Sequence, residues 1–76
     1  MNDQILRRVT EIASDTLEAD VTAASSPDTI PNWDSVRNLN LILALEDEYG
    51  LQFLPEETDQ VKSIRSLAEL VASKQS

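Results

Sequence analysis

The sequence has no cysteine and no histidine, and it has a single glycine. Without cysteine there is no disulfide, thiolate nucleophile or zinc–thiolate site. Without histidine there is no imidazole metal ligand and no base for a Ser-His-Asp relay. Long apolar runs are missing too, because the longest weakly polar segment, 38–45, is far shorter than the roughly 20 residues of a membrane span. The first residues, MNDQILRRVT, contain no signal-peptide pattern, so a cytoplasmic protein is expected.

Basic residues are also scarce. Six Lys and Arg stand against 14 Asp and Glu, which gives a formal net charge of −8. Nucleic acid and anionic membranes are therefore poor partners, because both are bound through clustered Lys and Arg. The 76 residues suffice for a single domain over 1–76, for which we expect a monomer and basic protein partners.

Apolar residues recur at helical spacing along most of the chain, which predicts an all-α bundle of three main helices and one short helix. The expected helices are 3–18, Ser35 to Tyr49 ended by a left-handed Gly50, a short one from Pro55 to about Val61, and a last one capped by Ser63. The second helix has more apolar residues than one stripe needs, so we expect it to be buried on about two sides.

Residues 19–33 separate the first two helices and contain two prolines and two adjacent serines. This composition predicts a long ordered loop, with Val21, Ile30 and Trp33 packed onto the bundle. A loop of about 15 residues is unusual in a compact domain and is often functional.

Asp34 and Ser35 stand where this loop meets the second helix. Both residue types are favoured N-caps, which is the ordinary structural interpretation. A serine oxygen at a helix N-terminus is also well placed to carry a phosphate ester, because free N–H groups and the helix dipole favour negative charge. Asp34 would then help a modifying enzyme, by binding its metal or by orienting the hydroxyl. The serine is not expected to be a catalytic nucleophile, because the chain has no histidine base.

The stretch WDSVRNLNLILALEDEYG, from Trp33 to Gly50, resembles the signature helix of acyl carrier proteins and related carrier domains. Their motif is Asp-Ser-Leu, followed by an apolar helix that ends in Ala-Leu-Glu-x-Glu and an aromatic residue. The resemblance extends over essentially the whole chain and implies an acyl-carrier-like four-helix bundle with a long first loop.

The resemblance also implies a function. A separate phosphopantetheinyl transferase would attach 4′-phosphopantetheine from coenzyme A to Ser35, with Asp34 in support. The arm's thiol would hold acyl or aminoacyl groups as thioesters, received from a loading ligase and delivered to an acyltransferase or synthase. The protein itself would catalyse nothing.

The region after the serine departs from the common family pattern. Val36 replaces the usual leucine, and Arg37, Asn38 and Asn40 stand where the family often has acids. Because partners of the family dock through basic patches, this change predicts a specialised discrete carrier for amino acids or secondary-metabolite chains rather than for bulk fatty acid synthesis. Equally, Arg37 could merely pair locally with Asp34.

The remaining acids near the second and third helices form either a solvated surface or a second docking patch. The full set of expected docking residues is Val36, Arg37, Asn40, Glu46, Asp47, Glu48, Glu56 and Glu57. A cargo pocket would have to open among the apolar residues Leu41, Leu45, Phe53, Val61 and Ile64.

Two other functions compete with the carrier. The first is an acidic helical interaction module without a prosthetic group. The second, an enzyme, is the weakest, because Glu46 and Glu48 lie on different faces of their helix. No metal site is expected, since the spacing of the acids does not match a calcium-binding loop.

Overall fold

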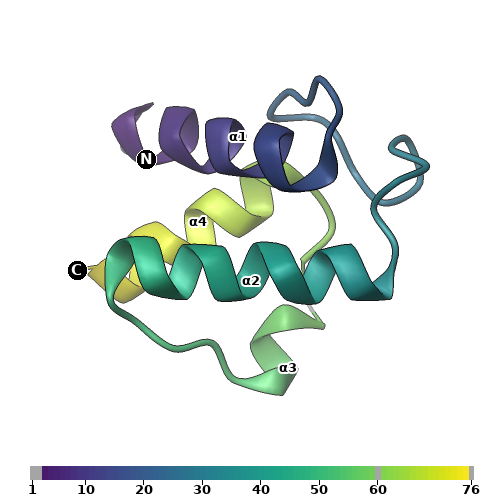
Figure 1. Ribbon diagram of the computed structural model, residues 1–76. Helices are drawn as coiled ribbons and strands as arrows, with labels where there is room; N and C mark the ends of the chain where they lie inside the picture. Colours follow the sequence, from purple (N-terminus) through teal and green to yellow (C-terminus); the bar gives the residue numbers. More distant parts are fainter. Residues whose placement is uncertain (1–2, 60, 76) are drawn as a thin grey trace.

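The computed structural model describes residues 3–59 and 61–75, which form helices and loops without a strand. The helices are α1 (Asp3–Leu17), α2 (Ser35–Tyr49), α3 (Pro55–Thr58) and α4 (Ile64–Gln75). α1 packs against both α2 and α4. In the view of Figure 1 the short α3 lies below α2, and α1 lies above it. The predicted all-α bundle of three main helices and one short helix is confirmed. None of the described helices has the length and apolar character that crossing a membrane requires.

One face of each main helix builds the core, together with residues of the long loop. The buried apolar side chains are Val9, Ala13, Leu17, Val21, Ile30, Trp33, Leu41, Ile42, Leu45, Ile64, Leu67, Ala68 and Val71. The prediction that three loop residues pack onto the bundle is therefore confirmed.

The expectation that α2 is buried on two sides is wrong. Leu41, Ile42 and Leu45 are buried, whereas Val36, Leu39 and Leu43 are exposed. The four-residue α3 contributes no buried residue and is too short to cover a second face of α2. An apolar strip of α2 consequently remains on the surface.

The loop between α1 and α2 is hydrogen-bonded to the end of α1 and to the start of α4. Where α1 ends, Glu18 has a left-handed backbone (φ 53°), and the Asn32 side chain donates to the Leu17 carbonyl at 3.1 Å. Further along, the Ser25 carbonyl accepts from the Ile64 amide at 2.9 Å, at the start of α4. Because the loop satisfies backbone groups at two helix ends, it has a defined path to the head of α2.

Local signals place the ends of α2 and α4 as expected. Gly50 ends α2 with φ 63°, and its amide donates to the Glu46 carbonyl. At the start of α4, the Ser63 hydroxyl accepts from the Ser66 amide at 3.2 Å, as an N-cap should. Both predictions are confirmed.

The short helix α3 ends at Thr58 rather than near Val61. Its N-terminus is stabilised by Glu57, whose carboxylate accepts from the Leu54 amide at 2.8 Å. The Val61 amide donates to the Thr58 carbonyl at 3.2 Å, three residues back, so the chain turns here instead of continuing as an α-helix.

Candidate functional site

Ser35 is the first residue of α2, and it is exposed. Within the described part of the chain its hydroxyl makes no hydrogen bond. The long loop delivers the serine to the end of the helix where the backbone N–H groups point outward. The structure therefore leaves the oxygen of Ser35 accessible to a reagent from solvent.

Asp34 is the N-cap of α2. Its backbone is extended (φ −97°, ψ −175°), and its Oδ1 accepts from the Arg37 amide at 2.9 Å. The Asp34 carbonyl accepts the first helical hydrogen bond, from the Asn38 amide at 2.8 Å. The capping interpretation is thus confirmed, and it leaves the Ser35 hydroxyl without a structural task.

A small hollow of about 210 Å³ lies beside the serine. Its lining residues come from the loop, the head of α2 and the segment before α4: Pro27, Trp33, Asp34, Ser35, Asn38 and Val61. The Trp33 ring is 4% exposed, and its Nε1–H donates to Asn38 Oδ1 at 2.9 Å. This bond fixes the loop against the first turns of α2. Sequence reasoning did not find the hollow, although it identified Trp33 as a packing residue.

Arg37 connects the head of α2 to the end of α1. Its Nη1 donates to the Thr16 carbonyl at 3.2 Å and lies 3.4 Å from the Glu18 carboxylate. The local ion pair with Asp34, one of the two alternatives for Arg37, is not formed, and only the backbone amide of Arg37 bonds that carboxylate. The guanidinium turns to α1 because the last carbonyls of a helix need donors and attract a cation.

Among the acids that were expected to dock partners, Glu46 and Glu48 have tasks within the fold. The Glu46 carboxylate accepts from the Phe53 amide at 2.8 Å, which fixes the connector after α2. Both oxygens of Glu48 accept from the Arg8 guanidinium of α1 at 3.1 Å. The hydrogen bond from Arg8 lowers the pKa of Glu48, and the same bond raises the pKa of Arg8.

Glu57 is the third acid with an internal partner. Its carboxylate lies 2.7 Å from Lys74 Nζ of α4. The hydrogen bond from Lys74, and then the one from the Leu54 amide, lower the pKa of Glu57. Asp47 and Glu56 are exposed and have no ion pair in residues 3–59 and 61–75. These two carboxylates are therefore the members of the expected set that a partner can reach without displacing an internal contact.

The five residues expected to surround cargo belong to one apolar cluster. Leu41, Leu45 and Ile64 are wholly buried, while Phe53 and Val61 are partly buried at its edge. Val61 lines the hollow beside Ser35 and also a second hollow of about 250 Å³ between α3 and α4. The Lys74 ammonium lies 5.8 Å from the centre of the Phe53 ring, on the outer side of the cluster.

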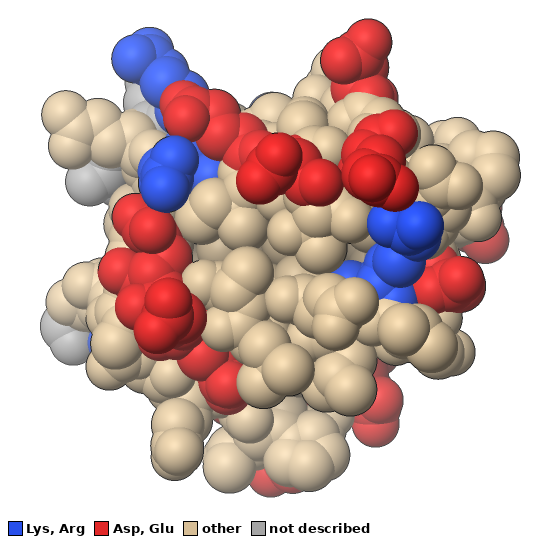
Figure 2. Space-filling view, in the orientation of Figure 1, with Lys and Arg blue, Asp and Glu red and all other residues tan. Residues whose placement is uncertain are grey.

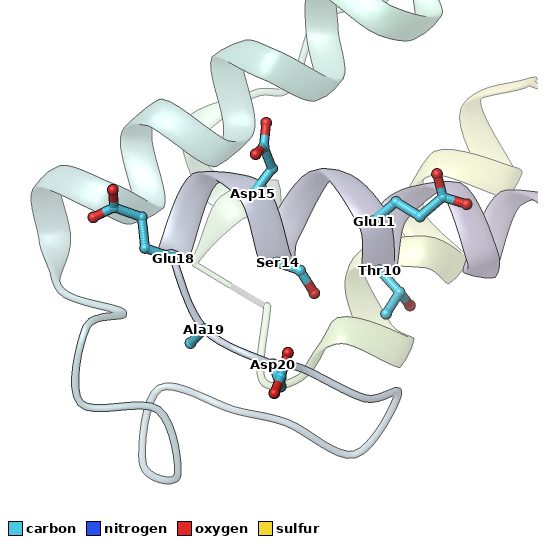
Figure 3. Close-up of a pocket in the computed structure, with 7 residues that line it drawn as sticks. All are labelled: Thr10, Glu11, Ser14, Asp15, Glu18, Ala19 and Asp20. Carbon is cyan, nitrogen blue, oxygen red and sulfur yellow. The ribbon is translucent and has the colours of Figure 1, made fainter.

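A broader hollow of about 630 Å³ lies along the C-terminal half of α1, and Ser35 is not among the residues that line it. Figure 3 shows that its carboxylates, Glu11, Asp15, Glu18 and Asp20, point in different directions and do not converge on one point. Over the described residues, no three such side chains are grouped so that they could hold a metal ion. This hollow is therefore an acidic surface without the arrangement of a metal site.

Comparison with known proteins gives a consistent result. The acyl carrier protein of Thermosynechococcus vestitus is 32% identical over 75 residues, covering 93% of this chain and 91% of that protein. The acyl carrier protein of Petrotoga mobilis is 31% identical over 75 residues, covering 95% and 88%. No protein-family model matches the chain.

A solved structure is similar as well. The solution structure of a holo acyl carrier protein from Geobacter metallireducens superimposes with a TM-score of 0.82 at 32% sequence identity. The match covers 92% of this chain and 84% of that protein. The likeness therefore extends over most of this chain.

Proposed function

This chain belongs to the acyl carrier protein family, and on that premise we propose that Ser35 carries a 4′-phosphopantetheine arm. When bound, the arm supplies a thiol that holds acyl or aminoacyl groups as thioesters. The protein is then a non-catalytic carrier, served by a phosphopantetheinyl transferase, a loading ligase and a downstream acyltransferase or synthase. The observation that carries the proposal is the exposed, unbonded Ser35 hydroxyl at the head of α2, in a fold that is similar to a holo acyl carrier protein.

The residues around Ser35 suit a phosphodiester-linked arm. The Asp34 side chain accepts a hydrogen bond from the Arg37 amide, while the amides of Ser35 and Val36 make no hydrogen bond within the described residues. Such N–H groups and the positive end of α2 favour an attached phosphate. The hollow of about 210 Å³ beside Ser35 gives the arm room to lie against the protein.

We propose a supporting role for Asp34. Its Oδ1 is held by the cap, whereas its Oδ2 has no partner in the described part of the chain. An exposed carboxylate oxygen one residue from the serine can accept a hydrogen bond from the serine hydroxyl. Alternatively, it can bind the metal of the modifying enzyme. The capping hydrogen bond keeps the Asp34 side chain at the head of α2, and it leaves Oδ2 available for this role.

We further propose that the pathway is specialised and that the cargo is short, such as an aminoacyl group. Leu41, Leu45 and Ile64 are wholly buried, so a long acyl chain would have to displace packed side chains to enter among them. The small hollow beside Ser35, by contrast, is lined by Asp34 and Asn38 as well as by apolar groups.

The cargo proposal can be tested by loading the protein with acetyl-, hexanoyl- and dodecanoyl-pantetheine from the corresponding coenzyme A thioesters. A ligand that binds only the folded state raises the melting temperature. We expect the melting temperature of the dodecanoyl form to be little or no higher than that of the acetyl form. A dodecanoyl form that melts several degrees higher than the acetyl form would show that the core opens for long chains and would refute the short-cargo proposal.

The docking surface proposed for partner enzymes contains Val36 and Asn40 near the serine and the acids Asp47 and Glu56 farther away. Arg37, Glu46, Glu48 and Glu57 belong to the same surface, although each also has an internal partner. A partner with a purely basic contact patch would therefore meet Val36, Leu39 and Asn40, which are uncharged, on the first turns of α2. This arrangement supports selection of partners other than those of bulk fatty acid synthesis.

The carrier function is tested by intact-mass analysis after incubation with coenzyme A and a broad-specificity phosphopantetheinyl transferase. One phosphopantetheine adduct is expected on the wild-type protein and none on Ser35→Ala. Failure of the wild type to react, under conditions that modify another carrier protein, would refute the proposal. It would favour the alternative, an acidic interaction module without a prosthetic group.

A further inference from the structure

The hydrogen bond between Trp33 and Asn38 fixes the direction of the Asn38 side chain. An indole N–H can only donate, so the group of Asn38 that faces it at 2.9 Å is the oxygen, Oδ1. The amide nitrogen, Nδ2, is on the other side of the same carbon and faces away from the indole. Trp33 is 4% exposed and belongs to the core cluster, which holds its ring in place. The tryptophan therefore determines which end of Asn38 is left for another partner.

That end is an unused donor beside Ser35. Asn38 Nδ2 donates no hydrogen bond within residues 3–59 and 61–75. The half-buried Asn38 side chain lines the hollow of about 210 Å³ that Ser35 also lines. Because Oδ1 is occupied, the hydrogen-bonding group that Asn38 offers to a molecule in this hollow is Nδ2. The fold already fixes this side chain, so a bound group does not have to order it.

A group attached to Ser35 lies within reach of this donor. Ser35 and Asn38 are three residues apart on α2, which puts their Cβ atoms roughly 5–6 Å apart. Arg37 is closer in the sequence, but its Nη1 donates to the Thr16 carbonyl at 3.2 Å and lies 3.4 Å from the Glu18 carboxylate. The surface over α2 that Figure 2 shows is largely uncharged. The side-chain donor available to a phosphate on Ser35 is therefore the neutral amide of Asn38.

The rest of the hollow is partly apolar. Pro27, Trp33 and Val61 contribute apolar groups to its lining. In 4′-phosphopantetheine the unit that follows the phosphate is the pantoyl unit, which has two methyl groups on one carbon. A fixed amide donor beside apolar side chains thus matches the chemistry of a phosphate that is followed by a dimethyl-substituted carbon.

We infer that Asn38 Nδ2 donates to an oxygen of the arm's phosphate and that the pantoyl unit rests in the hollow. In this arrangement Asn38 is a positioning residue, and Trp33 acts through it by fixing the direction of its amide. The inference rests on the proposed function, because it concerns the arm attached to Ser35. A hydrogen bond to a charged oxygen is stronger than one between neutral groups. The first part of the arm is therefore expected to lie against the loop and α2 instead of moving freely in solvent.

The first test compares the apo and holo forms of the wild-type protein by NMR. The holo form is made with coenzyme A and a transferase, and intact mass confirms complete conversion. We expect nuclear Overhauser contacts from the pantoyl methyl protons to the Trp33 ring and the Val61 methyl groups. The side-chain amide signals of Asn38 should shift between the two forms, whereas those of Gln52, exposed elsewhere, should not.

The second test separates the donor of Asn38 from its structural task. Asn38→Asp keeps an oxygen for Trp33 but has no N–H, and Gln52→Glu makes the same charge change away from the hollow. In apo Asn38→Asp the indole N–H signal should stay close to its wild-type position. In the holo form the contacts from the arm to Val61 should weaken about threefold or more, whereas Gln52→Glu should leave them unchanged. Trp33→Phe removes the indole N–H and should weaken the same contacts to an intermediate extent.

Several results would overturn the inference. One is a fully modified wild type whose arm makes no contact with Trp33 or Val61 and whose Asn38 amide signals do not shift. Another is arm contacts that are as strong in Asn38→Asp as in the wild type. Contacts that Asn38→Asp recovers at high salt would show that charge repulsion, and not the lost donor, had weakened them.

Failure of the inference and failure of the proposed function are distinguishable. A modified protein with a freely moving arm refutes the role of Asn38 and leaves the carrier function intact. A wild-type protein that the transferase does not modify refutes the carrier function itself. Circular dichroism establishes that the variants are folded, and the comparison of apo and holo wild type decides the question if they are not.

Discussion

The hydrogen bond between Trp33 and Asn38 offers a sharp test of how the site is held together. The indole is 4% exposed, and its Nε1–H donates to Asn38 Oδ1 at 2.9 Å. Asn38→Ala removes the acceptor and leaves a nearly buried N–H unpaired, which costs about 1–3 kcal/mol. The hollow beside Ser35 is bounded by both residues, so water can replace part of the bond, and we expect about 1–2 kcal/mol.

That loss is large for a chain of this size. At roughly 0.05–0.15 kcal/mol per residue, the whole domain has about 4–11 kcal/mol of stability. A loss of 1 kcal/mol lowers Tm by about 4–8 °C in a domain of 60–100 residues. We therefore expect Asn38→Ala to melt at least about 4 °C below the wild type.

Trp33 is the only tryptophan, so its fluorescence reports on this site directly. Urea unfolding followed by tryptophan emission, and thermal melts by circular dichroism, give the stability and the local environment together. Asn38→Asp is the matched control, because it keeps an acceptor oxygen and adds a negative charge near the positive end of α2. An Asn38→Ala protein that melts within 1 °C of the wild type, or an Asn38→Asp protein that is the less stable of the two, would refute the reasoning.

Three further predictions concern the cap, the core and the response to acid. Asp34→Ala should lose about 1 kcal/mol of stability in urea unfolding, whereas Asp34→Asn, which keeps a capping oxygen, should lose little; equal losses would contradict the assigned cap. Leu45→Ala should lose about 2–5 kcal/mol because the side chain is wholly buried. Leu43→Ala, on the exposed strip of the same helix, should change stability by less than about 0.5 kcal/mol in the same assay. Lys74 lowers the pKa of Glu57 below its ordinary value of 4.5, so this pair stabilises the fold above that pH. The contribution is lost as the pH falls through the lowered pKa, so the difference in stability between Glu57→Gln and the wild type should shrink as the pH is lowered from 7. A difference that stays constant as the pH falls would refute the assignment.

The helices could be predicted because their signals are local. Asp34, Gly50 and Ser63 each act on backbone groups within a few residues, and the structure has each in its expected role. The apolar period that predicts α1 and α4 is likewise a property of one helix at a time. The C-terminal end of α3 is harder to predict from the sequence. The helix ends at Thr58, before Val61, and nothing in the neighbouring residues predicts that end.

The partners of the charged residues could not be predicted from the sequence. The sequence suggests Asp34, a near neighbour in the chain, as a partner for Arg37. In the structure, the Arg37 guanidinium instead binds groups at the end of α1. Glu48 bonds Arg8, which is 40 residues away in the sequence. Such pairs depend on how α1 and α2 are packed, so they become visible only when the helices are placed in space.

The exposed face of α2 was overlooked for a related reason. The number of apolar residues in α2 predicts burial on about two sides, but the sequence pattern does not say which neighbour will cover Leu39 and Leu43. In the structure, α3 is too short to do so, and both leucines are more than half exposed. Figure 2 shows the largely uncharged surface over α2. A pattern of hydrophobic residues thus predicted the helix correctly but not the number of faces that are buried.

The most direct test of the central claim is the identity of the modified residue. The wild-type protein is incubated with coenzyme A and a transferase, digested, and analysed by tandem mass spectrometry. The account predicts one phosphopantetheine on the peptide that contains Asp34 and Ser35, located on the serine oxygen. An adduct on any other residue, or an unmodified Ser35 where a reference carrier protein is fully converted, would contradict it.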